Sequence, residues 1–172
     1  QKITSQAVEM NVSESMATTI DNFDSNVVSS AKMMSDEDYQ NLLQIVEAEA
    51  GTEDIKGRIM VANVIMNRVK YSEFPDNVTD VIWEYNNGVA QFSPVEDGRI
   101  SEVTVSRETK EAVKQVLEGV DYSKGALFFI QKSAAAKSNI SWFDKNLKRL
   151  FKHGVHEFYT YPDEVLRENA EN

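Results

Sequence analysis

Several residue types that carry chemistry are scarce or missing in this chain of 172 residues. It contains no Cys, so disulfide bonds, zinc–thiolate sites and thiol catalysis are excluded. Its two His lie outside any His-Glu-x-x-His pattern, and its seven Gly are isolated rather than gathered into a phosphate-binding loop. No apolar run of about 18 residues is present, so no membrane span is expected. The sequence predicts neither a metal site nor a cofactor.

Basic residues are outnumbered, since 18 Lys and Arg stand against 28 Asp and Glu, which gives a net charge of −10. Nucleic-acid affinity comes mainly from Lys and Arg that neutralise phosphates, so this balance disfavours a nucleic-acid partner. The acid is concentrated in residues 36–53, which hold six acids and no base, and in the two ends of the chain. Residues 132–152 instead hold six bases and one acid. We interpret this basic segment as a solvated face, and the alternative, a surface that meets anionic polymers, stays open.

Length and patterning predict one folded domain between two tails. Residues 1–34 are rich in Ser, Thr and Asn and lack a sustained apolar period, so we expect a flexible N-terminal tail or linker. Residues 35–161 are expected to form the folded domain, and residues 162–172 an acidic C-terminal tail. Because the sequence begins with Gln rather than Met, we expect a processed product or an engineered fragment, from which any targeting signal has been removed.

Apolar residues at helical spacing predict an α+β domain, mainly helical and with a small sheet. Ser35, followed by three acids, predicts the start of the first helix, and Gly51 predicts its end. Thr52 is expected to cap a second helix that runs to about residue 70. The other expected elements are a short helix at 78–83, a turn at 86–88, a loop or short strands at 91–100, a helix at 106–119, strands at 126–130 and 156–160, and a helix at 143–151.

Glu49 is the most unusual charged residue of the first predicted helix. It lies at the edge of the apolar face in the last turn, where the helix dipole disfavours a carboxylate. Partial burial, that dipole and the nearby Glu47 and Glu53 would all raise its pKa. A carboxylic acid that stays protonated near neutral pH is what a general acid for glycosidic cleavage needs. From the pattern alone, a solvated acidic helix end with ordinary pKa values is the simpler interpretation.

Motifs in a fixed order add to this local pattern. Residues 46–53 read Val-Glu-Ala-Glu-Ala-Gly-Thr-Glu, and residues 57–69 read Gly-Arg-Ile-Met-Val-Ala-Asn-Val-Ile-Met-Asn-Arg-Val. Phe-Pro at 74–75, Gln-Phe-Ser at 91–93, Asp-Gly at 97–98 and Gly-Ala-Leu-Phe-Phe at 125–129 follow. Over about residues 37–160 the chain thereby resembles the bacterial cell wall hydrolase family of the spore cortex-lytic enzyme type. It departs from the family at Gly51, where a basic residue is usual, and at Glu47, where a small or polar residue is common.

The resemblance implies a lytic transglycosylase-like domain, with a lysozyme-like helical lobe and a small antiparallel sheet around a groove. It implies an enzyme that cuts peptidoglycan glycan strands between N-acetylmuramic acid and N-acetylglucosamine and leaves 1,6-anhydro-muramic ends. Glu49 is the implied catalytic residue, first as general acid and then as base. The resemblance also implies action outside the cell, in the cell wall or spore envelope, in sporulation or germination, with an accessory germination or wall protein as a partner to look for.

Six further residues are candidates for substrate binding. They are Gln91, Phe92, Ser93, Trp142, Tyr159 and Glu53. The first three match a family loop that should line the groove, and the aromatic residues are either sugar platforms or core residues. Glu53 matches a family Glu, and its alternative role is structural, for example as a cap of the second helix.

Three other interpretations of the whole chain stay open. A hydrolytic muramidase on the same scaffold would use water in place of the muramic C6 hydroxyl. A non-catalytic cell wall binding module would keep the fold without the chemistry, and an unrelated acidic interaction protein would bind no peptidoglycan. The choice between spore cortex and vegetative wall as substrate also stays open.

Overall fold

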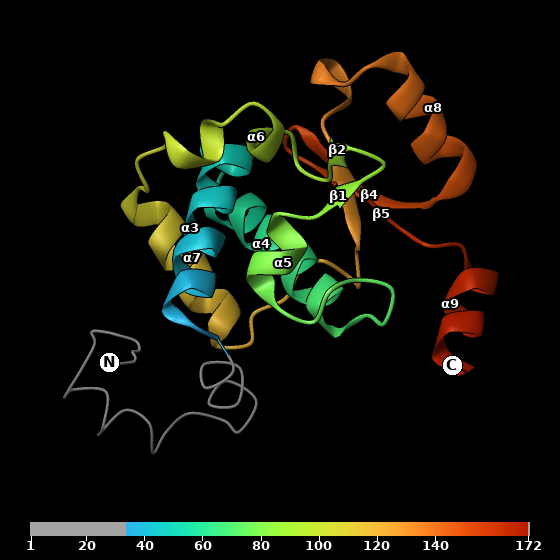
Figure 1. The fold of residues 1–172 in the computed structure, drawn as a ribbon, viewed down its shortest axis with the longest axis horizontal. Helices are drawn as coiled ribbons and strands as arrows, with labels where there is room; N and C mark the ends of the chain where they lie inside the picture. Colours follow the sequence, from blue (N-terminus) through green and yellow to red (C-terminus); the bar gives the residue numbers. More distant parts are fainter. Residues whose placement is uncertain (1–33, 172) are drawn as a thin grey trace.

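The structure, a computed structural model, describes residues 34–171 and shows a helical lobe beside a small antiparallel sheet (Figure 1). The expected mainly helical α+β class is confirmed. The tail expected at 1–34 lies, apart from residue 34, outside the described residues and stays a prediction. Between residues 34 and 171, no helix has the length and apolar character needed to cross a bilayer.

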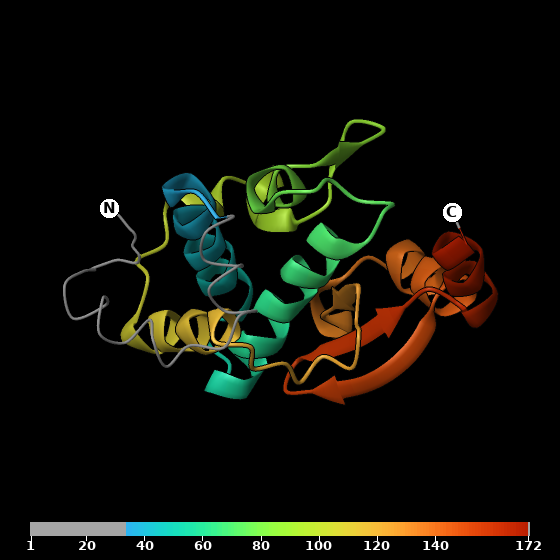
Figure 2. The same cartoon turned by 90° about the horizontal axis from the view of Figure 1, so that it is seen from below.

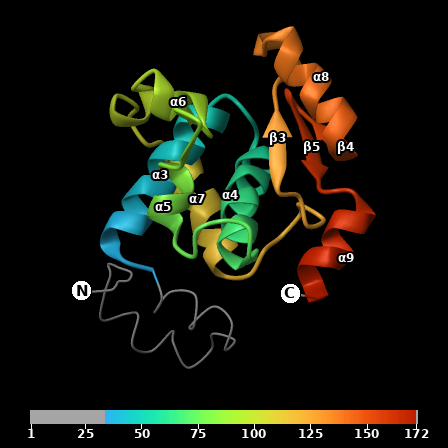
Figure 3. The same ribbon diagram turned by 45° about the vertical axis from the view of Figure 1, so that its right-hand side comes forward.

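Helix α4 (Ile55–Lys70) is the centre of the helical lobe. It packs against α3 (Asp36–Ala50), α5 (Val78–Ile82) and α7 (Arg107–Leu117) on one side and against strand β3 (Phe128–Ile130) on the other. Figures 2 and 3 show α4 running between the other helices and the sheet. The buried faces of the helices form one apolar cluster, because α3 and α4 place Leu, Ile and Val at three- and four-residue spacing.

Capping side chains fix where α3 and α4 begin. The Ser35 hydroxyl accepts a hydrogen bond from the Asp38 amide, and the Asp38 carboxylate accepts one from the Ser35 amide, which is a capping box. The helix start predicted at Ser35 is therefore confirmed. The predicted cap of α4, Thr52, is wrong, because Asp54 Oδ1 accepts from the Gly57 amide at 2.7 Å. Asp54 directly precedes the helix, where a side-chain oxygen reaches the free amides of the first turn.

Strands β3, β4 (Lys148–His153) and β5 (His156–Thr160) form an antiparallel sheet in the order β3-β5-β4. Strand β5 is therefore central, and β4 and β5 form a hairpin whose turn contains Gly154 at a φ of 58°. A glycine suits this turn because L-residues with side chains rarely adopt a positive φ. The two strands expected from the sequence, near 126–130 and 156–160, are confirmed.

A smaller hairpin joins β1 (Tyr85–Asn86) to β2 (Val89–Ala90). Its turn residues, Asn87 and Gly88, have φ values of 54° and 78°. Two successive positive φ angles are what a tight two-residue hairpin requires, and Asn-Gly supplies them most readily. The turn predicted at 86–88 is thus confirmed.

Residues 91–100, predicted as a loop or short strands, are helical instead. They contain helix α6 (Ser93–Glu96) and most of a 3₁₀ turn, η1 (Arg99–Ser101). Pro94 stands in the first turn of α6, where its fixed φ favours a helix and its missing amide hydrogen costs nothing. The sequence prediction missed this because the segment is too short to show a helical period.

The helix predicted at 143–151 is also wrong. After the 3₁₀ turn η2 (Lys132–Ala134), helix α8 (Lys137–Asn146) ends before that segment does, and β4 follows. Phe151 of β4 pairs with Phe158 of β5, and their rings stack with centroids 5.0 Å apart. This contact joins residues that are apart in the sequence, so a local pattern does not reveal it.

The acidic segment expected at 162–172 forms helix α9 (Asp163–Glu171) over most of its length. Its Asn169 side chain donates a hydrogen bond to the Tyr71 hydroxyl at the end of α4. Together with the ion pair between Asp163 of α9 and Lys148, this contact attaches the C-terminal segment to the domain through polar side chains, since no residue of α9 is buried.

Candidate active site

Glu49 lies half-buried in the last turn of α3. Burial raises the pKa of its carboxyl to about 7, while the charge of Arg99 lowers this pKa and that of Asp97 raises it. Within residues 34–171, no hydrogen-bond donor reaches the Glu49 carboxylate. The group therefore holds a proton close to neutral pH and has no partner in this part of the chain that competes for it.

A buried guanidinium covers the backbone carbonyls that follow Glu49. Arg58 of α4 donates from Nε to the Ala50 carbonyl at 3.2 Å and from Nη2 to the Gly51 carbonyl at 2.6 Å. These bonds fix the turn between α3 and α4 and offset the negative end of the α3 dipole. Burial, one of the causes expected from the sequence, is the main cause of the raised Glu49 pKa.

The Glu47 carboxylate, expected to repel the charge of Glu49, is hydrogen-bonded to residues at the start of helix α7. Its Oε1 accepts from the Ser106 amide and hydroxyl, both at 2.9 Å, and from the Thr109 hydroxyl at 2.7 Å. Burial raises the pKa of Glu47, but these hydrogen bonds lower it more, so its pKa lies below the ordinary value. The like charge that acts on Glu49 is Asp97 instead.

Arg99 connects the loop around Ser93 to the last turn of α3. Its Nε pairs with the Asp97 carboxylate at 2.8 Å, its Nη2 donates to the Ser93 hydroxyl at 3.2 Å, and its Nη1 donates to the Ala48 carbonyl at 3.4 Å. The structure thereby brings the predicted residue Ser93 to the segment that carries Glu49. Ser93 is exposed at this end of α3, where its hydroxyl is bound by Arg99.

The other two residues of the predicted loop face the interior. Gln91 is half-buried, and its Oε1 accepts from Arg68 Nη1 at 3.4 Å. Phe92 is only 4% exposed and stacks on Phe129, with ring centroids 6.0 Å apart. The Arg68 guanidinium lies over the Phe92 ring and donates to the Leu127 carbonyl at 2.7 Å. The structure thus places Phe92 in the core, the alternative that the sequence left open.

Glu53 joins the α3–α4 turn to the β4–β5 turn. Its Oε1 accepts from the Val155 amide at 3.0 Å, and the space where a Cβ on Gly154 would lie is occupied by the Glu53 carboxylate. Next to it, Asp54 Oδ1 and His153 Nε2 lie 2.8 Å apart. These contacts give Glu53 a structural place, and the predicted substrate contact of Glu53 stays a prediction.

The two remaining candidates belong to the sheet side of the molecule. Tyr159 of β5 has no exposed surface, and its hydroxyl donates to Asp144 Oδ1 at 2.8 Å. Trp142 of α8 is 50% exposed and packs edge-on against Phe143, with centroids 5.8 Å apart. Neither contacts the Glu49 turn, so the structure does not bring the predicted set into one cluster.

Sequence reasoning overlooked several charged groups of the site. Asp97 and Arg99 act on Glu49, and their only signal in the sequence was the Asp-Gly motif at 97–98.

Two buried polar atoms, Glu84 Oε1 and His156 Nδ1, have no hydrogen-bond partner in the described part of the chain. No group of three His, Asp or Glu side chains suited to a metal ion occurs among residues 34–171.

The sequence and the fold both match known proteins. The profile of the cell wall hydrolase family, Hydrolase_2, matches residues 52–159. The chain belongs to the cell wall hydrolase family. The matched range begins three residues after Glu49, so the role of Glu49 depends on geometry and motif rather than on this match.

Named relatives agree with this family. Spore cortex-lytic enzymes of Halalkalibacterium halodurans and Bacillus subtilis are 38% and 34% identical to this cell wall hydrolase over 119 residues. That stretch covers 69% of this chain but 34% and 37% of theirs, so the chain spans little more than a third of these relatives. The catalytic domain of the germination-specific lytic transglycosylase SleB from Bacillus anthracis aligns with a TM-score of 0.62 at 31% identity, over 73% of this chain and 96% of that one. The SleB catalytic domain from Bacillus cereus aligns with a TM-score of 0.59 at 28% identity, over 74% of this chain and 92% of that one.

Proposed function

We propose that this cell wall hydrolase cleaves the glycan strand of peptidoglycan and that Glu49 is its general acid. The observation that carries the proposal is a half-buried carboxyl whose pKa is raised to about 7 and which no donor in residues 34–171 engages. The family, and the similarity to a lytic transglycosylase catalytic domain, support a glycan as the substrate. The names of the relatives support the spore cortex or cell wall as the place of action.

The proposed reaction uses one carboxyl group twice. Protonated Glu49 gives its proton to the glycosidic oxygen as the bond from that oxygen to the muramic C1 breaks. The resulting Glu49 carboxylate then takes the proton of the muramic C6 hydroxyl while that oxygen bonds to C1. A 1,6-anhydro end forms, no water is consumed, and Glu49 regains its proton.

The surrounding acids support a single-carboxylate mechanism. Glu47 is held by Ser106 and Thr109, and Glu53 is held by the Val155 amide. Both are ordered acceptors in structural contacts, whereas Glu49 accepts from no donor in the described chain. With Glu47 and Glu53 held in these contacts, a single general acid suits transfer to an internal hydroxyl better than hydrolysis.

Asp97 favours the second candidate, a hydrolytic muramidase. Its charge reaches Glu49, and its side chain is exposed beside Arg99. A second carboxylate of this kind can activate a water molecule, as glycoside hydrolases require. Since Arg99 holds Asp97 in an ion pair and lowers its pKa, Asp97 is a weak base, and we place this mechanism second.

The experiment compares the wild type with Glu49→Gln and Glu37→Gln on purified peptidoglycan and on spore cortex. Glu37 is exposed in the first turn of the same helix, so its variant is a matched control for the loss of one acid. We expect Glu49→Gln to release almost no soluble fragments and Glu37→Gln to act as the wild type does. Full activity of Glu49→Gln would remove Glu49 from the mechanism. A wild type that binds both materials and cleaves neither would identify a binding module instead.

A further inference from the structure

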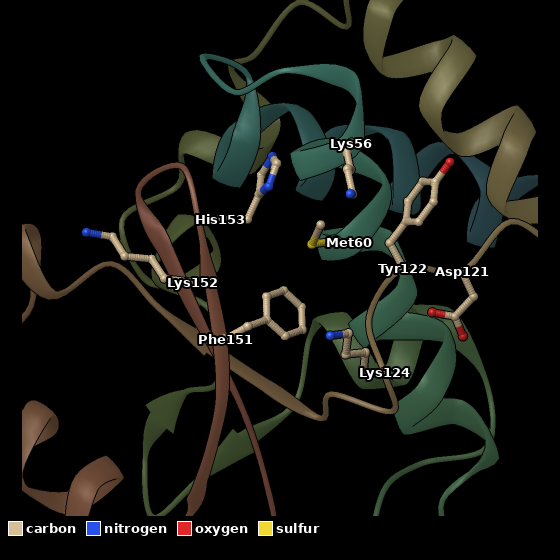
Figure 4. A pocket seen from close by; sticks show the side chains of 8 residues that line it. All are labelled: Lys56, Met60, Asp121, Tyr122, Lys124, Phe151, Lys152 and His153. Carbon is tan, nitrogen blue, oxygen red and sulfur yellow. The ribbon is translucent and has the colours of Figure 1, made fainter.

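A cavity of about 560 Å³ lies between the start of α4, the segment that follows α7, and strand β4 (Figure 4). This is within the range of about 300–1,000 Å³ that is usual for sites of small organic ligands. Its lining residues are Lys56, Met60, Asp121, Tyr122, Lys124, Phe151, Lys152 and His153. None of the residues that act on Glu49 lines it, so it is separate from the candidate active site.

Among the described residues, neither Lys56 nor Lys124 forms a salt bridge, although the charge of Lys56 lowers the pKa of the nearby Asp54. Figure 4 shows Lys56 and Lys124 reaching into the cavity from opposite sides, whereas Lys152 points away. Lys56 Nζ lies 4.9 Å from the centre of the Tyr122 ring, and Lys124 Nζ lies 5.5 Å from that of Phe151. An aromatic face attracts a cation without neutralising it, so both charges remain available to an anion.

Half of the basic residues in the segment at 132–152 are in ion pairs. Lys132 and Arg149 both pair with Glu157, at 3.3 and 2.9 Å, and Lys148 pairs with Asp163 at 3.0 Å. These ion pairs agree with the solvated face interpreted from the sequence. The positive charge directed into the cavity lies at Lys56 and Lys124, outside this segment, because Lys152 points away from the cavity.

Lys124 has an uncommon backbone conformation at the edge of this cavity. Lys124 has a φ of 55°, a left-handed conformation that is uncommon for a residue with a long side chain. Such residues are concentrated at functional sites. The one acid of the cavity, Asp121, is engaged, because its Oδ1 accepts from the Ser123 amide and hydroxyl, both at 2.7 Å. It closes a turn, and Figure 4 shows its carboxylate directed away from the two ammonium groups.

We propose that this cavity binds a carboxylate-bearing peptide, namely the stem peptide that peptidoglycan carries on its muramic residues. The proposal rests on the proposed function, since a glycan-cleaving enzyme meets such peptides on its own substrate. Two ammonium groups on opposite walls suit a ligand with two separated carboxylates. The apolar surface of Met60, Phe151 and Tyr122 between them suits the alkyl part of a peptide better than a compact inorganic anion.

The test measures binding to the full chain by titration calorimetry. The probe is the synthetic tripeptide alanyl-γ-glutamyl-diaminopimelate, and its controls are the same peptide with every carboxylate amidated and inorganic phosphate. We expect the tripeptide to bind, with a Kd that rises about fivefold in Lys56→Gln and again in Lys124→Gln. Lys110→Gln, an exposed lysine of α7 outside the cavity, should leave the Kd unchanged.

Three results overturn the proposal. They are no binding of the tripeptide, equal binding of its amidated form, and equal affinity for phosphate, which would describe an unspecific anion site. The thermal unfolding of each variant is followed in parallel, and a Lys→Gln change at an exposed position should not move it. If both lysine variants unfold early, Lys56→Arg and Lys124→Arg, which keep the charge, must bind as the wild type does, or the proposal fails.

A second readout separates this proposal from the proposed function. Glu49→Gln should bind the tripeptide as the wild type does, because binding needs no cleavage. On peptide-bearing glycan, Lys56→Gln should raise KM and leave kcat unchanged, whereas on glycan stripped of its peptides it should match the wild type. A chain that binds the peptide and cleaves no glycan refutes the function and keeps the site, and the reverse result refutes the site alone.

Discussion

The Glu47 carboxylate occupies the space beside Gly51 that a side chain at that position would need. A Cβ built on Gly51 would lie 2.5 Å from Glu47 Oε2 and 2.5 Å from the Glu47 carbonyl oxygen. Both positions were the departures from the family pattern, and the structure shows that they are coupled. Glu47 holds α7 through Ser106 and Thr109, and a small residue at 51 makes room for it.

This coupling predicts the stability of two variants. Gly51→Ala should lower the free energy of unfolding by about 1–3 kcal/mol, because the new Cβ forces the Glu47 side chain and backbone to shift. In a Glu47→Ala background the cost should be smaller but not zero, since the backbone oxygen remains in the way. Chemical denaturation of the four proteins of this double-mutant cycle measures both effects. Equal costs in the two backgrounds would show that the Glu47 carboxylate does not limit position 51.

The raised pKa of Glu49 predicts that this residue destabilises the fold at high pH. The carboxyl titrates near 7 in the native state and near 4.5 in the unfolded state. The folded protein therefore loses stability as the pH rises from about 4.5 to about 7. Glu49→Gln removes the titration, so at about pH 8 it should stabilise the protein by about 1–3 kcal/mol. At about pH 4 the difference should vanish, because both forms are neutral there. Thermal unfolding across this range measures the effect, and a Glu49→Gln that is less stable at high pH contradicts it.

Arg99 and Asp97 should move the pH profile of cleavage in opposite directions. Arg99 lowers the pKa of Glu49, so Arg99→Gln should raise that pKa and extend activity to higher pH. Asp97 raises the Glu49 pKa, so Asp97→Asn should lower it and bring the loss of activity to lower pH. The rate on labelled peptidoglycan as a function of pH measures both, with shifts of about 0.5–1 pH unit expected. Shifts of the same sign in both variants would contradict the assigned electrostatics.

Two variants of Glu53 distinguish a structural role of this residue from a catalytic one. Its contact with the Val155 amide should make Glu53→Ala less stable by about 1 kcal/mol, since the amide then loses its acceptor. Glu53→Gln retains an oxygen in that place and should keep both the stability and most of the cleavage activity. Unfolding and cleavage are measured on the same samples. A stable Glu53→Gln that no longer cleaves would make Glu53 a member of the catalytic machinery.

Local sequence signals predicted the helical lobe well. Ser35 and Asp38 cap α3 through each other, and the apolar spacing of α3 and α4 is visible within a few turns. Strand β4 was not predicted, because it forms by pairing with β5, where its Phe151 lies opposite Phe158. Helix α6 was not predicted, because four residues are too few to show a helical spacing of apolar residues.

The site was predictable in its centre and not in its surroundings. Helical phase alone placed Glu49 at the edge of a buried face, and burial is the main cause of its raised pKa. The charges that adjust it, Asp97 and Arg99, lie about 50 positions further along the chain and reach it only through the fold. The two cavity lysines could not be predicted from the sequence either, since only the packing of α4 beside the segment after α7 brings Lys56 and Lys124 to one cavity.

The mass of the fragments released from peptidoglycan tests the central claim most directly. Wild-type enzyme and Glu49→Gln are incubated with the same purified glycan, and the soluble muropeptides are analysed by mass spectrometry. If Glu49 acts alone as acid and then base, wild-type fragments end in 1,6-anhydro-muramic acid and are one water lighter than reducing fragments, and Glu49→Gln releases none. Reducing ends from the wild type, or unchanged anhydro products from Glu49→Gln, would contradict this account.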